Sequence, residues 1–121
     1  MARKIMLIED DQPILDMMDM ALRRIGYEPV LVGDVARALE IVRGSPPDLV
    51  LLDLMMTPIN GWEFLDMLRK EPGMKELPVI LFTALPLTDE KLLVRNDPKL
   101  GVLNKPVSLD QLKEGIEKFF G

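Results

Sequence analysis

The chain has 121 residues, of which 48% are hydrophobic, and it carries a formal net charge of −5 with neither cysteine nor histidine. This length fits one domain over residues 1–121, and the composition excludes disulfides, thiolate metal sites and histidine chemistry. The acidic charge argues against direct nucleic-acid binding, and no apolar run approaches the roughly 20 residues of a membrane span. We therefore expect a cytoplasmic protein whose chemistry uses carboxylates, lysine, hydroxyls and hard cations.

Five short apolar runs are predicted to be strands. They occupy residues 4–8, 29–32, 48–52, 78–82 and 100–103. The first, third and fourth runs are apolar almost throughout, which is typical of strands buried on both faces of a parallel sheet. The second run contains Pro29, which has no backbone N–H to donate and therefore indicates an edge strand.

Segments of helical period separate these runs. Pro13 indicates the first turn of a helix that ends near Gly26, and Asp34 is the predicted cap of a second helix. Further helices are expected over residues 61–70, over residues 88–96, and after a capping box that begins at Ser108. The alternation predicts an α/β fold: a three-layer (βα)₅ doubly wound parallel sheet of flavodoxin-like topology, with strand order 2-1-3-4-5.

In this topology the side chains that follow the strands gather at one edge of the sheet. Those residues are Glu9, Asp10 and Asp11 after the first strand, Asp53 after the third, Thr83 and Ala84 after the fourth, and Asn104, Lys105 and Pro106 after the fifth. Carboxylates held close together repel unless a cation joins them or one of them takes up a proton, and oxygen ligands suit Mg²⁺. The set predicts phosphoryl transfer: Asp53 attacks phosphorus, Mg²⁺ and Lys105 stabilise the charge, and Thr83 donates a hydrogen bond.

Four motifs in order resemble the receiver domains of bacterial two-component response regulators. They are IMLIEDD at residues 5–11, LLDLMM at 51–56, FTA at 82–84 and KP at 105–106, within a resemblance that spans residues 4–119. It implies that Asp53 is the phosphoacceptor and that Glu9 and Asp10 are the acidic metal-binding pair, with Asp10 the more direct ligand of Mg²⁺. It also implies that the backbone carbonyl of Met55 is a ligand. Asp11 is interpreted as the cap of the first helix.

The resemblance further implies that Thr83, Ala84 and Lys105 form the phosphate-binding and switch positions, with a cis peptide bond between Lys105 and Pro106. The implied donor is a phosphohistidine on a sensor histidine kinase or a histidine phosphotransfer protein, which binds near the first helix. The implied recipient of the signal is an unidentified downstream protein or output domain. Such a domain is not an enzyme, beyond promoting its own phosphorylation and dephosphorylation.

The sequence departs from the family pattern in three places. Thr57 and Pro58 alter the loop after the acceptor, Val102 stands where receivers carry an aromatic switch residue, and residues 97–101 lack the usual Gly-Ala pair. The methionines, including Met17 and Met20, are expected to fill the core.

Three other functions would make different demands on this sequence. A phosphorylation-independent pseudo-receiver would keep the fold but lose part of the site. An aspartate-dependent Mg²⁺ phosphatase needs an acidic or hydroxyl residue where Met55 stands. A flavodoxin-like flavin carrier needs a phosphate-binding loop after the first strand, where this chain is acidic.

Overall fold

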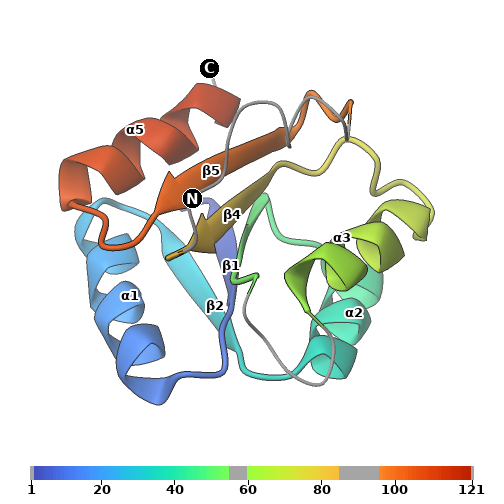
Figure 1. Ribbon diagram of the computed structural model, residues 1–121, viewed down its shortest axis with the longest axis horizontal. Coiled ribbons are helices and arrows are strands. Elements are labelled where there is room, and N and C mark those ends of the chain that lie inside the picture. Colours follow the sequence, from blue (N-terminus) through green and yellow to red (C-terminus); the bar gives the residue numbers. More distant parts are fainter. Residues whose placement is uncertain (1, 55–59, 85–95, 121) are drawn as a thin grey trace.

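A parallel sheet of five strands forms the centre of the protein (Figure 1), which we describe from a computed structural model over residues 2–54, 60–84 and 96–120. The strands are β1 (Lys4–Ile8), β2 (Glu28–Val32), β3 (Leu49–Leu52), β4 (Val79–Thr83) and β5 (Leu100–Asn104). Their order is β2-β1-β3-β4-β5 and every neighbouring pair is parallel. The predicted topology is confirmed.

The first, third and fourth apolar runs of the sequence form β1, β3 and β4 and occupy the interior of this sheet, as predicted. Every residue of β3 and β4 is at most 1% exposed, because helices cover both faces of these strands. Pro29 lies on β2, an edge strand, where β1 is its only neighbour in the sheet and a missing N–H does not interrupt a ladder on the outer side.

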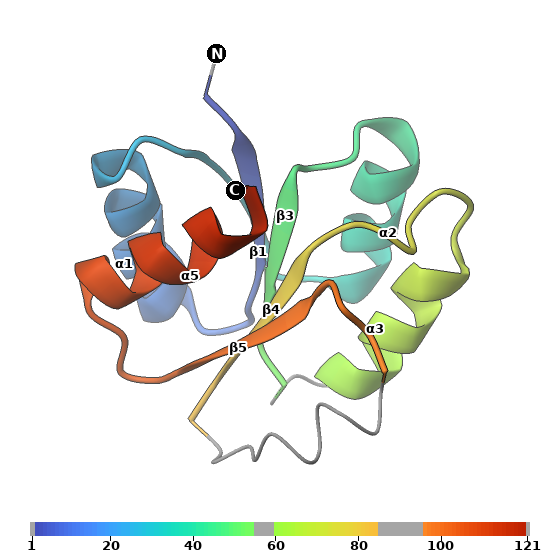
Figure 2. The same ribbon diagram turned by 90° about the horizontal axis from the view of Figure 1, so that it is seen from above.

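Helices pack in two layers on the sheet (Figure 2). One layer consists of α1 (Gln12–Arg24) and α5 (Leu109–Phe120), and the other of α2 (Val35–Gly44) and α3 (Gly61–Lys70). None of the helices within the described ranges is both long and apolar enough to cross a membrane.

The predicted caps begin three of these helices. The Asp11 carboxylate accepts a hydrogen bond from Ile14 N at 3.4 Å, and the Asp34 carboxylate accepts one from Ala36 N at 2.9 Å. Ser108 and Gln111 exchange two hydrogen bonds of 3.0 and 3.1 Å between side chain and backbone, which is the reciprocal capping box expected for α5.

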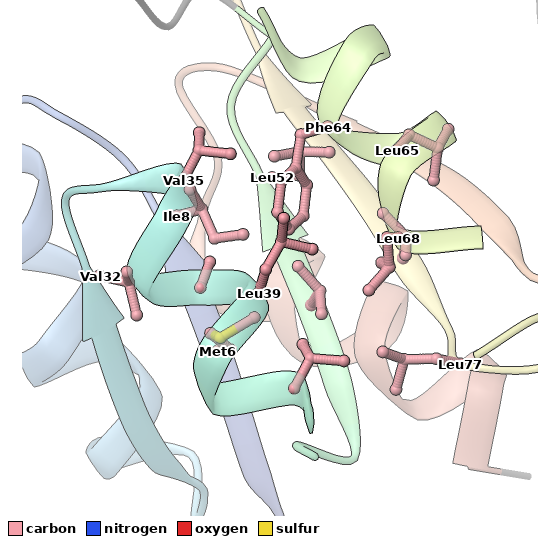
Figure 3. Close-up of a cluster of buried hydrophobic side chains, with 14 of the residues drawn as sticks. Met6, Ile8, Val32, Val35, Leu39, Leu52, Phe64, Leu65, Leu68 and Leu77 are labelled. Atoms are coloured by element: carbon pink, nitrogen blue, oxygen red, sulfur yellow. The ribbon is translucent and has the colours of Figure 1, made fainter. Parts of the chain in front are cut away.

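The hydrophobic core is divided by the sheet. Beneath α2 and α3, Met6, Ile8 and Leu52 of the sheet pack against Leu39 and Phe64 of the helices (Figure 3). The second cluster, between the sheet and the α1–α5 layer, is built from Leu7, Leu51 and Phe82 with residues of those helices. Both faces of the central strands are thus sealed from water, which leaves the ends of the strands as the place for polar chemistry.

The structure differs from the sequence predictions in some strand boundaries and in the placement of two methionines. β4 and β5 include Thr83 and Asn104 as their last residues rather than ending before them, and β2, β3 and β4 begin one residue away from the predicted starts. Met17 and Met20 are 58% and 73% exposed, so the expectation that they fill the core is wrong, since both lie away from the face of α1 that Leu15, Met18 and Leu22 bury. The helix predicted over residues 88–96 falls outside the described residues except for Asn96, which lies in a turn.

Gly61, the first residue of α3, touches the backbone that leaves β3. A Cβ added to Gly61 would lie 2.7 Å from the carbonyl oxygen of Asp53 and 2.7 Å from Cα of Leu54. Gly61 N also donates a hydrogen bond of 3.1 Å to Leu54 O. The helix therefore begins in backbone contact with the residue that the sequence singles out as functional.

We predict that Gly61→Ala lowers the free energy of unfolding by about 2 kcal/mol, because backbone atoms must move to admit the methyl group. Gly44→Ala is the matched control: nothing lies within 4 Å of its added Cβ, and a change of about 0.5 kcal/mol in the stabilising direction is expected. Urea unfolding of both variants measures the difference. Equal stabilities would contradict the close approach.

Candidate functional site

The carboxyl ends of β1, β3, β4 and β5 place polar residues at one edge of the sheet. Glu9 and Asp53 directly follow β1 and β3, and Asp53 N donates a hydrogen bond of 3.2 Å to Ile8 O. Thr83 ends β4, and its carbonyl oxygen accepts a hydrogen bond of 2.8 Å from Lys105 N, which follows β5. Backbone hydrogen bonds thus fix where these side chains start.

Three carboxylates meet at this edge. Ligand oxygens of Glu9, Asp10 and Asp53 all lie within 4.8 Å of one another. Glu9 and Asp53 are 1% and 3% exposed, whereas Asp10 is exposed. A divalent cation can therefore reach the cluster from the side of Asp10 while contacting a carboxylate that faces the core.

Glu9 is held by the protein through both of its oxygens. Its Oε1 accepts hydrogen bonds from the backbone N–H groups of Asp10 and Asp11, at 3.1 and 3.2 Å, and its Oε2 accepts one from Lys105 Nζ at 3.0 Å. Burial raises the pKa of Glu9 above its ordinary value and the neighbouring Asp53 raises it further, while Lys105 acts in the opposite direction.

Lys105 provides the positive charge of the cluster. Its Nζ lies 3.0 Å from Glu9 Oε2 and 3.7 Å from Asp53 Oδ2, with the side chain 19% exposed. It also stands 4.9 Å from the centre of the Phe82 ring, a cation–π contact that helps to orient the ammonium group. The peptide bond between Lys105 and Pro106 is cis.

Sequence reasoning missed two parts of the site. The contact of Phe82 with Lys105 is one of them, although Phe82 precedes Thr83 in the FTA motif. The use of Glu9 as an acceptor for the next two backbone N–H groups was also missed, since no residue pattern distinguishes it from metal binding.

The other predicted site residues are placed as follows. Thr83 is buried at the end of β4 and Ala84, the next residue, is exposed. Val102 lies in β5 opposite Leu81 and is half-buried against the α2–α3 cluster, so its side chain does not join the acidic group. Met55, Thr57 and Pro58 lie outside the described residues.

The arrangement favours binding of a cation together with an anion. Three carboxylates require positive charge, and Lys105 alone does not neutralise them. All-oxygen ligands beside an open side suit Mg²⁺, which keeps part of its water shell and accepts phosphate oxygens. Asp53 can act as a nucleophile only on a phosphoryl compound that binds at the same edge of the sheet.

Comparisons with known proteins agree on one family. Residues 5–117 match the model of the response regulator receiver domain. The chain is 30% identical over 117 residues to the phosphate regulon transcriptional regulatory protein PhoB of Klebsiella pneumoniae. The matched segment is 97% of this chain and 51% of that protein. The chain thus spans about half the length of this curated relative.

Solved structures give the same result. The N-terminal domain of a response regulator receiver protein from Methanoculleus marisnigri JR1 has a TM-score of 0.79 and 36% identity, with 96% of this chain and 94% of that chain covered. A second solved structure is the receiver domain of the sensor histidine kinase PA1611 from Pseudomonas aeruginosa PAO1, described with a magnesium ion in its active-site cleft. Its TM-score is 0.87, with 100% of this chain and 99% of that chain covered, and at 22% identity it shows the shared fold.

We predict that Lys105→Met, studied without metal, lowers the free energy of unfolding at neutral pH by about 3 kcal/mol, because Glu9 loses its buried counter-charge. Glu9→Gln in the same background should recover most of this loss in urea unfolding. The loss should also shrink as pH falls through the raised pKa of Glu9, since a protonated carboxyl needs no counter-charge. A loss that is independent of pH and of Glu9→Gln would contradict the pairing.

Proposed function

We propose that this chain, which belongs to the family of response regulator receiver domains, takes a phosphoryl group onto Asp53 from a phosphohistidine and thereby changes its protein contacts. The observation that carries the proposal is the placement of Asp53 at the end of β3, within 4.8 Å of two further carboxylates and 3.7 Å from Lys105 Nζ. This arrangement surrounds one nucleophilic carboxylate with the groups that phosphoryl transfer requires.

The cofactor that we propose is Mg²⁺, held by Asp10 and Asp53 with Glu9 beside them. Asp10 is the more direct ligand of the acidic pair, because both oxygens of Glu9 already accept hydrogen bonds from Lys105 and the backbone. The ligand role of the Met55 carbonyl stays a prediction. When bound, Mg²⁺ supplies positive charge that offsets the charge on the phosphoryl oxygens. The magnesium ion described for the PA1611 receiver domain supports this choice.

In the transfer step that we propose, an Asp53 carboxylate oxygen forms a bond to phosphorus while the bond between phosphorus and the donor imidazole nitrogen breaks. The imidazole leaves with that electron pair. Lys105 offsets negative charge on the transferred group, and the Thr83 hydroxyl donates a hydrogen bond to one of its oxygens. Ala84, exposed directly after Thr83, belongs to the same phosphate-binding position.

The partners that we propose are a sensor histidine kinase or histidine phosphotransfer protein as the donor, and a downstream protein or output domain as the recipient. The cytoplasm remains the predicted location, and direct binding of nucleic acid by this chain is not expected from its net charge of −5. The pseudo-receiver alternative predicts no response of this site to a phosphoryl donor.

Incubation with acetyl phosphate and Mg²⁺ should add one phosphoryl group to the chain, as measured by intact mass. Asp53→Ala should abolish the addition, and so should removal of Mg²⁺ by a chelator. Asp16→Asn is the matched control, because it replaces an aspartate of α1 that accepts a hydrogen bond from Gln12 and is not part of the acidic cluster, and it should be phosphorylated normally. Equal labelling of Asp53→Ala and wild type would refute the acceptor assignment.

Asp10→Asn should weaken Mg²⁺ binding by at least about tenfold, since it removes a ligand carboxylate. The binding is measured by titration of Trp62 fluorescence, because Trp62 lies next to Gly61 at the start of α3. Asp11→Asn serves as the control: it alters a cap of α1 and leaves the affinity within about twofold. If Asp11→Asn and Asp10→Asn weaken binding alike, the ligand assignment is wrong.

A further inference from the structure

Arg69, in the last turn of α3, donates four hydrogen bonds at the end of the sheet opposite the acidic cluster. Its Nε donates to Asp97 Oδ2 at 2.9 Å, and its Nη1 donates to Met74 O at 2.8 Å and to Leu77 O at 2.6 Å. Its Nη2 donates to Lys99 O at 3.3 Å. The side chains of Arg69 and Asp97 are only 16% and 15% exposed. An ion pair of this kind is much less screened than one on the open surface.

The groups that Arg69 binds control where β5 begins. Asp97 Oδ1 accepts a hydrogen bond from Lys99 N at 3.0 Å, and Asp97 O accepts one from Leu100 N at 3.3 Å. Lys99 O also accepts a hydrogen bond of 2.9 Å from Val79 N, the first residue of β4. The turn before β5 and the start of β4 are therefore held on the same guanidinium group.

The middle of β5 is interlocked with α5. Gly101 of β5 faces the ring of Phe119, and a Cβ added there would lie 3.1 Å from two ring atoms. Gly115 of α5 faces Leu103 in turn, and its added Cβ would lie 3.0 Å from a Leu103 methyl carbon. Each glycine makes room for a large side chain of the opposite element, so the strand and the helix cannot slide past each other without collision.

The far end of β5 is fixed at the acidic site. Lys105 N donates a hydrogen bond of 2.8 Å to Thr83 O, a backbone contact that does not depend on where the Lys105 ammonium group lies. β5 is thus held at its start, in its middle and at its end. Leu100 and Val102, both half-buried, pack from β5 against the other layer.

We infer that Arg69 and Asp97 form a clamp that keeps β5, together with α5, in one arrangement whether or not Asp53 is phosphorylated. The inference rests on the proposed function of Asp53. By this inference, the phosphorylation-dependent change is confined to the end of β4 and its surroundings. The β5–α5 surface has the same conformation in both states. A partner that contacts this surface alone would bind both states equally.

The clamp has a physical basis in the cost of opening it. Moving β5 away from α3 would leave the Arg69 guanidinium and the Asp97 carboxylate partly buried without each other, and it would break the hydrogen bond from Arg69 to Lys99 O. The Met74 and Leu77 carbonyls precede β4 and would stay with Arg69. Separating buried charges costs more than separating an exposed pair. Arg43 and Glu71 form a more exposed pair between α2 and the end of α3, in which the Arg43 side chain is 60% exposed, and this pair provides a comparison.

The test is amide hydrogen exchange of the 121-residue chain, followed by NMR with and without beryllofluoride and Mg²⁺ as the phosphoryl mimic. In the wild type we expect the mimic to change exchange at Asp53, Thr83 and Ala84 and to leave the amides of residues 100–103 within about twofold. In Asp97→Asn, the amides of Val79 and Leu100 should exchange about tenfold faster without the mimic, and the response to the mimic should extend into β5.

Two controls separate the clamp from general loss of stability. Arg43→Gln removes the exposed pair and should leave exchange in β5 unchanged. Arg69→Lys keeps the charge but lacks the donors for all four acceptors, and it should loosen Val79 and Leu100 as Asp97→Asn does.

The inference is overturned if the mimic changes exchange in β5 of the wild type as strongly as at Thr83. It is also overturned if Asp97→Asn leaves Val79 and Leu100 as protected as in the wild type. Absence of any response to the mimic at Asp53 would instead count against the proposed function. The measurements without the mimic would then still decide whether the clamp exists.

Discussion

Burial of negative charge at the carboxyl edge of the sheet is the constraint on which the other features of this protein depend. Glu9 and Asp53 are almost fully removed from water, and a carboxylate in that position requires hydrogen bonds or a counter-charge. Lys105 and two backbone N–H groups meet this requirement for Glu9. Burial still raises the pKa of Glu9, and the neighbouring Asp53 raises it further, so a further cation at the cluster would offset the remaining negative charge.

This edge exists because the rest of the chain is arranged around a sheet that is apolar on both faces. The β1, β3 and β4 strands contribute apolar side chains to a separate cluster on each face, between the sheet and its helices. Polar residues of functional value are restricted to strand ends. Gly61 contacts the backbone of Asp53, and this contact fixes the start of α3 against the end of β3.

The two ends of the sheet differ in their electrostatics. At the acidic end, one lysine faces several carboxylates, and binding of additional charge is favoured. At the opposite end, Arg69 is matched by Asp97 and three carbonyl oxygens, so four of its five N–H donors are satisfied within the fold. Negative charge is in excess at one end of the sheet, and the charges at the other end are paired. This distribution suits a domain that responds to a charged group locally while the remainder keeps its conformation.

The sequence by itself determined the strand order, most element boundaries to within a residue or two, the three caps and the residues of the acidic edge. Apolar runs, Pro29 and the polar residues that follow each strand carry that information locally. Only the tertiary structure decided that Glu9 accepts hydrogen bonds from Lys105 and the backbone, that Phe82 lies beside the ammonium group, and that Arg69 reaches Asp97. It also decided that Met17 and Met20 face solvent. The contacts of Glu9 with Lys105, of Phe82 with Lys105 and of Arg69 with Asp97 join segments far apart in the chain, and the exposure of the methionines depends on which face of a helix is covered. Residue type and spacing leave both undetermined, and they also do not show that a carboxylate turns back to the next two N–H groups.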